Sequence, residues 1–186
     1  MSLTFDVLLA EHASPVLAGL KTSNLISCAR DVVPDLPARL PQYEQAFAQR
    51  GVRFRILCAC DRRYLLFVYR PAWLIEDLAS VETHALLKAN GYPMESGLEA
   101  LLDHLAERID TSAVFPHEIG LFLGYPVEDV SGFMEHGGKG CKLSGYWKVY
   151  GDAQAARRLF RRFDLCRSKA RACIDGGMTI IELFCA

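Results

Sequence analysis

Residues 52–69 read VRFRILCACDRRYLLFVY and carry the clearest β-strand pattern in the chain. Two apolar runs rich in β-branched and aromatic residues, 54–60 and 64–69, are separated by the polar tripeptide Asp61-Arg62-Arg63. Two such runs around a short polar turn are typical of a β-hairpin. The second run is apolar on both faces, which is typical of a central strand covered by helices. The segment therefore predicts a hairpin at 53–69 within a covered sheet.

Helical patterns lie on both sides of this hairpin. Apolar residues at three- and four-residue spacing predict helices at 3–13, near 42–50, and at 72–90, 96–109, 117–124, 127–136 and 153–173. Ser96 and Glu99 predict a capping box at the start of the 96–109 helix. Segments 145–150 and 179–184 are interpreted as strands, as is 25–28, although four residues do not decide between strand and helix.

Together these elements predict an α+β fold, or a three-layer α/β fold, in a single globular domain over residues 1–186. We expect a central mixed sheet that contains the hairpin and the 145–150 strand and is flanked by helices. A chain of 186 residues is long enough for one core, because domains of this size bury roughly 70% of their unfolded surface.

The composition is that of a folded protein, with 51% hydrophobic and 23% charged residues. No stretch of sequence approaches the ~20 continuous apolar residues that a membrane helix needs. Asp6 and Glu11 stand where a signal peptide carries positive charge. We therefore expect a cytoplasmic protein that does not associate with membranes.

Seven cysteines, at 28, 58, 60, 141, 166, 173 and 185, lack the even spacing of a secreted disulfide framework. Reduced thiols are therefore expected. Cys58 and Cys60 alternate along the predicted strand, but two thiolates alone do not make a zinc site and no CxxC pair occurs. We predict no metal centre.

Charge is distributed unevenly, although the net charge is only -1. Residues 76–135 contain twelve acidic and two basic residues, whereas residues 148–171 contain eight basic and two acidic ones. The apolar stripe of the 153–173 helix places Arg157, Arg158, Arg161 and Arg162 on its flanks and outer face. A pI near 6.5 argues against nucleic-acid binding. An acidic partner protein, or the acidic middle of the same chain, accounts for these charges more simply.

Glycines and polar side chains concentrate in residues 115–152, FPHEIGLFLGYPVEDVSGFMEHGGKGCKLSGYWKVYGD. Glycine lets the backbone approach a ligand closely, so this stretch is interpreted either as a ligand surface at 116–150 or as turns joining short elements. The candidate ligand contacts are Lys21, Arg70, His117, Tyr125, Lys139, Lys142, Tyr146, Trp147 and Lys148. Tyr146, Trp147 and Lys148 are consecutive in the sequence. Convergence of the cationic groups would indicate an anionic ligand. Residues 137–140 lack the spacing of a P-loop, which leaves a generic anion-binding turn or a flexible turn.

Cys141 is flanked by Lys139 and Lys142, which favour the reactive thiolate. With His117 or His136 as base it would form a nucleophilic pair, although no sequence signature of a known thiol enzyme is present. His117 and Glu118 lack the second histidine of an HExxH zinc site.

Four stretches carry a family resemblance: LAGLKTSNL at 17–25, RRYLLFVYRP at 62–71, PHEIGLFLGYPVEDVSGFMEHGG at 116–138 and CKLSGYWKVYGD at 141–152. Over nearly the whole chain, they resemble the bacterial domain-of-unknown-function family 3793. The resemblance implies no established activity and no residue role. It does imply a cytoplasmic family common in anaerobic bacteria, some members of which are associated with flavodoxin-type proteins, and this association favours a redox context.

Three functions follow as expectations, and the sequence does not decide whether the protein is an enzyme or which cofactor it uses. The first is an accessory protein that binds a small molecule or cofactor at 116–150 in a redox context. The second is a thiol-dependent enzyme that uses Cys141 with His117. The third is an interaction module whose basic 157–171 helix docks on an acidic redox partner such as flavodoxin.

Overall fold

The computed structural model describes residues 3–112 and 114–185. The chain divides into two compact units: Met1–Ala72 with Arg162–Ala186, and Trp73–Arg161. Compact units of this kind occur within single domains as well as between domains, so the single domain over residues 1–186 stays a prediction. The α+β class is confirmed, because a small antiparallel sheet is flanked by helices.

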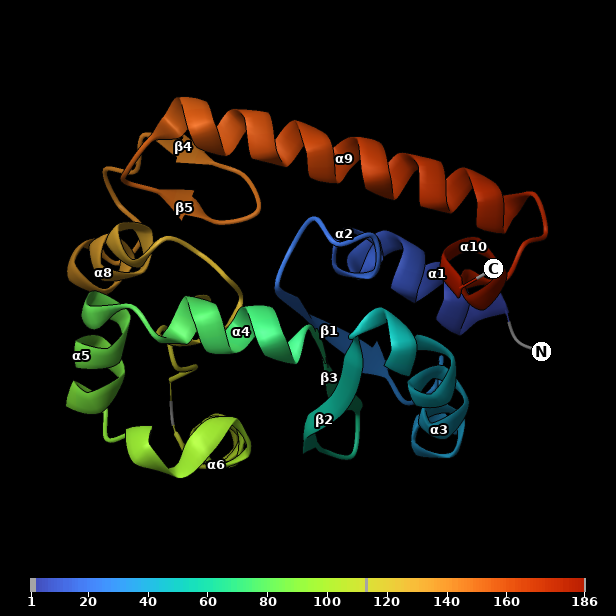
Figure 1. The fold of residues 1–186 in the computed structure, drawn as a ribbon, viewed down its shortest axis with the longest axis horizontal. Helices are drawn as coiled ribbons and strands as arrows, with labels where there is room; N and C mark the ends of the chain where they lie inside the picture. Colours follow the sequence, from blue (N-terminus) through green and yellow to red (C-terminus); the bar gives the residue numbers. More distant parts are fainter. Residues whose placement is uncertain (1–2, 113, 186) are drawn as a thin grey trace. The chain divides into compact units, whose positions relative to one another are not determined.

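The first unit is built on a three-stranded sheet in the order β1-β3-β2 (Figure 1). Its strands are β1 (Ser23–Ala29), β2 (Arg53–Ala59) and β3 (Arg63–Tyr69). The hairpin at 53–69 is confirmed, and the segment at 25–28 is a strand. Both neighbours of β3 run antiparallel to it, so the sheet is antiparallel and not mixed as predicted.

The central position of β3 follows from its composition. Leu66, Phe67 and Val68 are completely buried, as expected of a strand covered on both faces. The helices of this unit are α1 (Leu3–His12), α2 (Ser14–Leu17), α3 (Leu36–Phe47), the 3-10 turn η1 (Ala48–Arg50) and α10 (Ile180–Cys185). Helix α1 packs against β1, α3 against β2, and α10 against both helices.

The strand predicted at 179–184 is wrong, because this segment forms helix α10. Thr179 and Glu182 make a reciprocal capping box: the Glu182 carboxylate accepts from the Thr179 N–H at 2.7 Å, and the Thr179 hydroxyl accepts from the Glu182 N–H at 3.2 Å. Two helix donors are satisfied in this way. The capping box therefore favours a helix in a segment whose short apolar run is compatible with either a strand or a helix.

The capping box predicted at Ser96 does not form. Ser96 lies in the 3-10 turn η2 (Met94–Ser96) with φ -97° and ψ 4°, and its side chain makes no cap hydrogen bond. A capping serine needs extended backbone to aim its oxygen at the first helical turn. Helix α6 (Gly97–Thr111) begins without this cap.

The second unit is mostly helical. It contains most of α4 (Pro71–Leu78), then α5 (Val81–Ala89), η2, α6, α7 (Ile119–Phe122), α8 (Val127–His136) and the two-residue strands β4 (Leu143–Ser144) and β5 (Lys148–Val149). The helix predicted at 72–90 is two helices, because the Ser80 side chain accepts from the Thr83 N–H and starts α5.

The strand predicted at 145–150 is corrected in extent and in place. Only Lys148–Val149 is extended, and β5 pairs with β4 in a separate ribbon, not with the central sheet. The reason lies in the backbone of Tyr150 and Gly151, whose N–H groups donate to the Asp129 side chain instead of to a strand.

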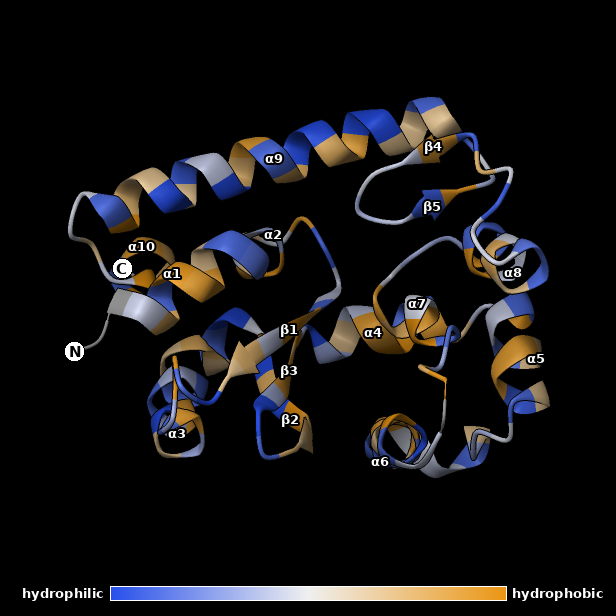
Figure 2. Cartoon of the chain, turned by 180° about the vertical axis from the view of Figure 1, so that it is seen from behind, coloured by the Kyte–Doolittle hydropathy of each residue, from blue (hydrophilic) through white to orange (hydrophobic). Residues whose placement is uncertain are grey.

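Helix α9 (Ala153–Asp175) has the predicted amphipathic character. Ala156, Phe160, Phe163 and Ala170 are buried, while Arg157, Arg158, Arg161 and Arg162 are exposed. Hydrophilic and hydrophobic patches alternate along it in Figure 2. Among the helices of the described residues, none is long and apolar enough to cross a membrane.

Candidate ligand-binding site

Asp129 organises the second unit from the first turn of α8. Its side chain is 3% exposed and accepts three N–H groups: the Trp147 indole at 2.7 Å, the Tyr150 amide at 2.6 Å and the Gly151 amide at 2.8 Å. A buried carboxylate is stable only when its oxygens are hydrogen-bonded. Asp129 therefore holds the segment after β4 against α8.

Close packing fixes the same segment. A side-chain carbon on Gly132 of α8 would lie 2.6 Å from the Tyr150 ring, so only glycine fits there. A side-chain carbon on Gly145 would overlap the Phe160 ring. Both glycines therefore let an aromatic ring pack directly on the backbone.

Trp147 is held in an aromatic cluster. Its ring stacks on Tyr125 with centroids 4.5 Å apart, and its edge meets Phe160 at 4.6 Å and 88°. These are favourable arrangements for aromatic pairs. Burial raises the pKa of Tyr125 to about 12, so its hydroxyl stays protonated near neutral pH.

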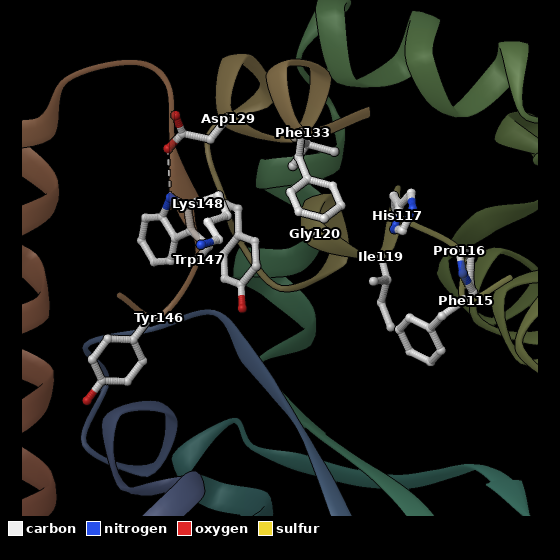
Figure 3. A pocket seen from close by; sticks show the side chains of 12 residues that line it. Phe115, Pro116, His117, Ile119, Gly120, Asp129, Phe133, Tyr146, Trp147 and Lys148 are labelled. Carbon is white, nitrogen blue, oxygen red and sulfur yellow. Dashed lines mark hydrogen bonds between the residues drawn. The ribbon is translucent and has the colours of Figure 1, made fainter. Parts of the chain in front are cut away.

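A cavity of about 240 Å³ opens beside this cluster. In Figure 3, Trp147 and Lys148 lie across it from His117 and Phe115, with Phe133 between them. Its lining residues are Phe115, Pro116, His117, Ile119, Gly120, Tyr125, Asp129, Val130, Phe133, Tyr146, Trp147 and Lys148. The walls are therefore mainly apolar and aromatic, and the basic residues of the lining are His117 and Lys148.

Glu118, the residue after His117, fixes the backbone on that side of the cavity. This carboxylate is 2% exposed and accepts from Arg108 Nε at 2.6 Å and from the Tyr92 hydroxyl at 3.2 Å. Burial and the neighbouring Glu118 charge raise the pKa of Tyr92. The segment before α7 is thus fixed to α6, while His117 itself is exposed and packs edge-on against Phe133 at 4.9 Å.

Five candidate residues from the sequence come together here: His117, Tyr125, Tyr146, Trp147 and Lys148 all line the cavity. Lys148 is half-buried and donates to the Ser144 hydroxyl at 3.0 Å. Their role as ligand contacts stays a prediction.

Lys139 and Lys142 lie elsewhere in the same unit. They line a second, open hollow together with His136, Gly140 and Tyr150. No residue is common to the linings of this hollow and of the aromatic cavity.

Lys21 and Arg70 belong to the first unit. The Arg70 guanidinium donates to the carbonyls of Val16, Leu17 and Arg50 at 2.7–3.0 Å. These bonds give Arg70 a structural role in the first unit. Lys21 is buried and donates to Asn24 at 2.7 Å. Burial lowers the pKa of Lys21 to about 7.

The described contacts do not join Cys141 to His117: His117 packs on Phe133, and Cys141 lies near Tyr150. The thiol enzyme therefore stays a prediction. Cys60 has a more specific setting, because it is exposed and the backbone N–H groups of Arg62 and Arg63 lower its thiol pKa. Within residues 3–112 and 114–185, no group of three or more His, Cys, Asp or Glu side chains could hold a metal ion.

Sequence reasoning missed Asp129, Glu118 and Phe133 as organisers of the site. Asp129 and Phe133 are four residues apart and therefore share one face of α8. An acidic residue on the inner face of a helix is the signal that could have singled out Asp129.

These features define an α+β protein whose second unit carries an aromatic-lined cavity. The chain belongs to the family described as protein of unknown function (DUF3793), whose model matches residues 9–184. The family predicted from the sequence is thereby confirmed. Comparison with curated proteins gives no match, and neither does comparison with solved structures.

Proposed function

We propose that this protein is a binding protein for a small, flat aromatic molecule with an acidic group, held in the cavity of the second unit. The observation that carries the proposal is the lining, in which Phe115, Tyr125, Phe133, Tyr146 and Trp147 surround one space. Ligand pockets are mostly apolar with a few placed polar groups. Aromatic walls favour a planar ligand that stacks on the rings or meets them edge-on.

The size of the cavity limits the ligand. Its volume of about 240 Å³ lies below the roughly 300–1,000 Å³ of pockets for drug-sized molecules. A one- or two-ring compound therefore suits it.

The charges of the lining favour an anion. Lys148 supplies an ammonium group, His117 adds a second basic side chain, and Asp129 is the lining carboxylate. Because Asp129 already accepts three N–H groups, it presents little free acceptor to a ligand. An acidic group near Lys148 would gain a charge-assisted hydrogen bond. The redox context follows from the family resemblance and stays a prediction.

The test is a titration of ¹⁵N-labelled protein with 2-naphthoate, followed through the tryptophan indole N–H signals. The chain has two tryptophans: Trp147 lines the cavity and Trp73 does not. We expect a saturable shift of the Trp147 signal and none at Trp73. The Trp73→Phe variant assigns the two signals.

Two comparisons sharpen this test. The Lys148→Met variant should weaken 2-naphthoate binding by about tenfold, because it removes one hydrogen bond to a charged group, and should leave neutral 2-naphthol unchanged. Lys88→Met, at an exposed lysine of α5, is the matched control. Failure of both naphthalene compounds to shift Trp147 would rule out the aromatic site.

A second candidate function rests on α9. Within the described residues, Arg157, Arg161 and Arg162 are exposed and form no ion pair, whereas Arg167 and Arg171 pair with carboxylates. Solvated cations on successive turns favour association with an acidic protein.

Flavodoxin, immobilised on a sensor surface, is a suitable acidic test partner. Binding that weakens with salt and disappears on reversing the three charges to Glu would support docking; salt-independent binding or none would refute it.

A further inference from the structure

The loop after α8, residues 137–142, shapes a second site that the proposed aromatic ligand does not use. Gly137 ends the helix in the left-handed region at φ 58°, and its N–H donates to the Phe133 carbonyl. The open hollow beside the loop has a volume of about 540 Å³ and is lined by His136, Lys139, Gly140, Lys142 and Tyr150. Its lining side chains are polar and basic, in contrast to the aromatic cavity.

Two backbone donors in this loop lack an acceptor. At other glycine turns the glycine N–H donates to a nearby carbonyl, as at Gly51, Gly91 and Gly124. In the part of the chain that the structure describes, the N–H groups of Gly140 and Cys141 make no such bond. Gly140 has φ 69° and open space on its side-chain face. Unpaired successive N–H groups in a glycine turn are typical of anion sites.

Side-chain charge adds to these donors. Lys142 is held beside the loop by its bond to the Gly151 carbonyl at 2.9 Å. Lys139 is exposed and, among the described residues, its side chain has no hydrogen-bond or ion-pair partner. The Tyr150 hydroxyl donates to the Lys139 carbonyl at 3.1 Å and so fixes the loop backbone.

Of the nearby carboxylates, Asp152 interacts electrostatically with Lys142 and offsets part of its charge. Asp152 accepts the N–H groups of Gln154 and Ala155 at the start of α9. Glu135 is 3.9 Å from the His136 ring and 73% exposed. The loop follows the carboxyl end of α8, where the helix dipole does not favour an anion. Attraction for an anion must therefore come from the two lysines and the unpaired N–H groups.

We propose that the 137–142 loop binds a phosphate group, with Lys139, Lys142 and the N–H groups of Gly140 and Cys141 as its contacts. A phosphate dianion has several acceptor oxygens and matches a set of backbone donors combined with flexible lysines. The group can come from inorganic phosphate or from a small phosphate ester, since both present the same oxygens to the loop.

The experiment follows the backbone amide signals of ¹⁵N-labelled protein, at constant ionic strength, during titration with inorganic phosphate and separately with glycerol phosphate, a phosphate ester without an aromatic ring. We expect saturable downfield shifts of the Gly140 and Cys141 amides with at least one of the two. Tighter binding of glycerol phosphate identifies an ester as the natural class of ligand, and equal or weaker binding identifies free phosphate.

Lys139→Gln should weaken phosphate binding by about tenfold, because a hydrogen bond to a charged group is lost. This side chain has no partner in the described fold, so the variant should fold normally, and Lys88→Gln is the matched control. Absence of saturable shifts with both phosphates would overturn the proposal, as would equal affinity in the Lys139→Gln/Lys142→Gln variant. The readout does not depend on 2-naphthoate, so this site and the aromatic site succeed or fail separately.

Discussion

Each unit has a nearly fully buried aspartate, and the two carboxylates accept hydrogen bonds in different surroundings. Asp6 in the first unit is 4% exposed and accepts from the Tyr43 hydroxyl at 2.6 Å and from the Ile180 N–H at 3.3 Å, inside the apolar core. Asp129 in the second unit is 3% exposed and holds a glycine-rich segment beside an open cavity. The comparison teaches that a buried carboxylate can stabilise an apolar core in one place and fix the wall of a cavity in another.

Replacing the two aspartates is the strongest test of this contrast. Asp129→Ala leaves three N–H donors unsatisfied, and we expect it to lower the free energy of unfolding by about 3 kcal/mol or more. Urea denaturation measures that loss. Asp6→Ala should cost about 2 kcal/mol but leave the Trp147 indole signal in place. A Trp147 signal that is unmoved in Asp129→Ala would contradict the role given to Asp129.

Lys21 provides a test in pH, because its pKa falls from 10.5 to about 7 on folding. Between these values the unfolded chain binds more protons than the folded chain, so stability rises with pH and this contribution is lost as pH falls through about 7. The gain should be about 2 kcal/mol between pH 7.5 and 9.5. Lys21→Met should flatten this slope, whereas Lys148→Met in the second unit should keep it.

A smaller effect is expected from Gly132→Ala in α8. The added methyl would lie 2.6 Å from the Tyr150 ring, and overpacking of this kind costs about 1–3 kcal/mol. Thermal unfolding measures the loss, and Ala155→Gly, at an exposed site in α9, is a control for helix propensity. Full stability in Gly132→Ala would mean that the ribbon is not seated on α8 as described.

The smallest effect concerns the labelling rates of two thiols, Cys60 in the first unit and Cys141 in the second. Cys60 is exposed and its pKa is lowered by the N–H groups of Arg62 and Arg63, so iodoacetamide should modify it severalfold faster than Cys141 near pH 7. Peptide mass spectrometry after brief labelling gives the order. Faster labelling of Cys141 would instead support the reactive thiol predicted from Lys139 and Lys142.

Local sequence patterns were sufficient to predict the helices and strands that have long or distinctive runs of apolar residues. The two apolar runs at 53–69 predicted the hairpin, and the doubly apolar 65–68 run predicted the central position of β3 correctly. The 179–184 run was too short for periodicity to separate strand from helix, and the Thr179–Glu182 box that decided it was overlooked. The capping-box pattern failed at Ser96, because Ser96 itself lies in a 3-10 turn that sets its backbone.

The candidate site was predictable as a region but not as a geometry. Glycine and aromatic content marked 116–150, and five candidate residues there share the cavity. Local sequence could not separate Lys139 and Lys142 from them, because placement depends on the bonds that Asp129 makes across 18 to 22 residues. Lys21 and Arg70 were proposed for their charge, but the contacts of Arg70 with three carbonyls arise only in the folded chain.

The bonds of Asp129 have a thermodynamic consequence. The Asp129 carboxylate holds Trp147, which lines the aromatic cavity. It also holds the backbone of Tyr150, a residue that lines the open hollow beside the 137–142 loop. If the two proposed ligands bind, a ligand that shifts either residue should change the position favoured by the other, and we expect occupancy of the two hollows to be linked. Linkage is reciprocal: the factor by which 2-naphthoate alters phosphate affinity must equal the factor by which phosphate alters 2-naphthoate affinity. Asp129→Asn, which weakens the shared anchor, should bring that factor closer to one.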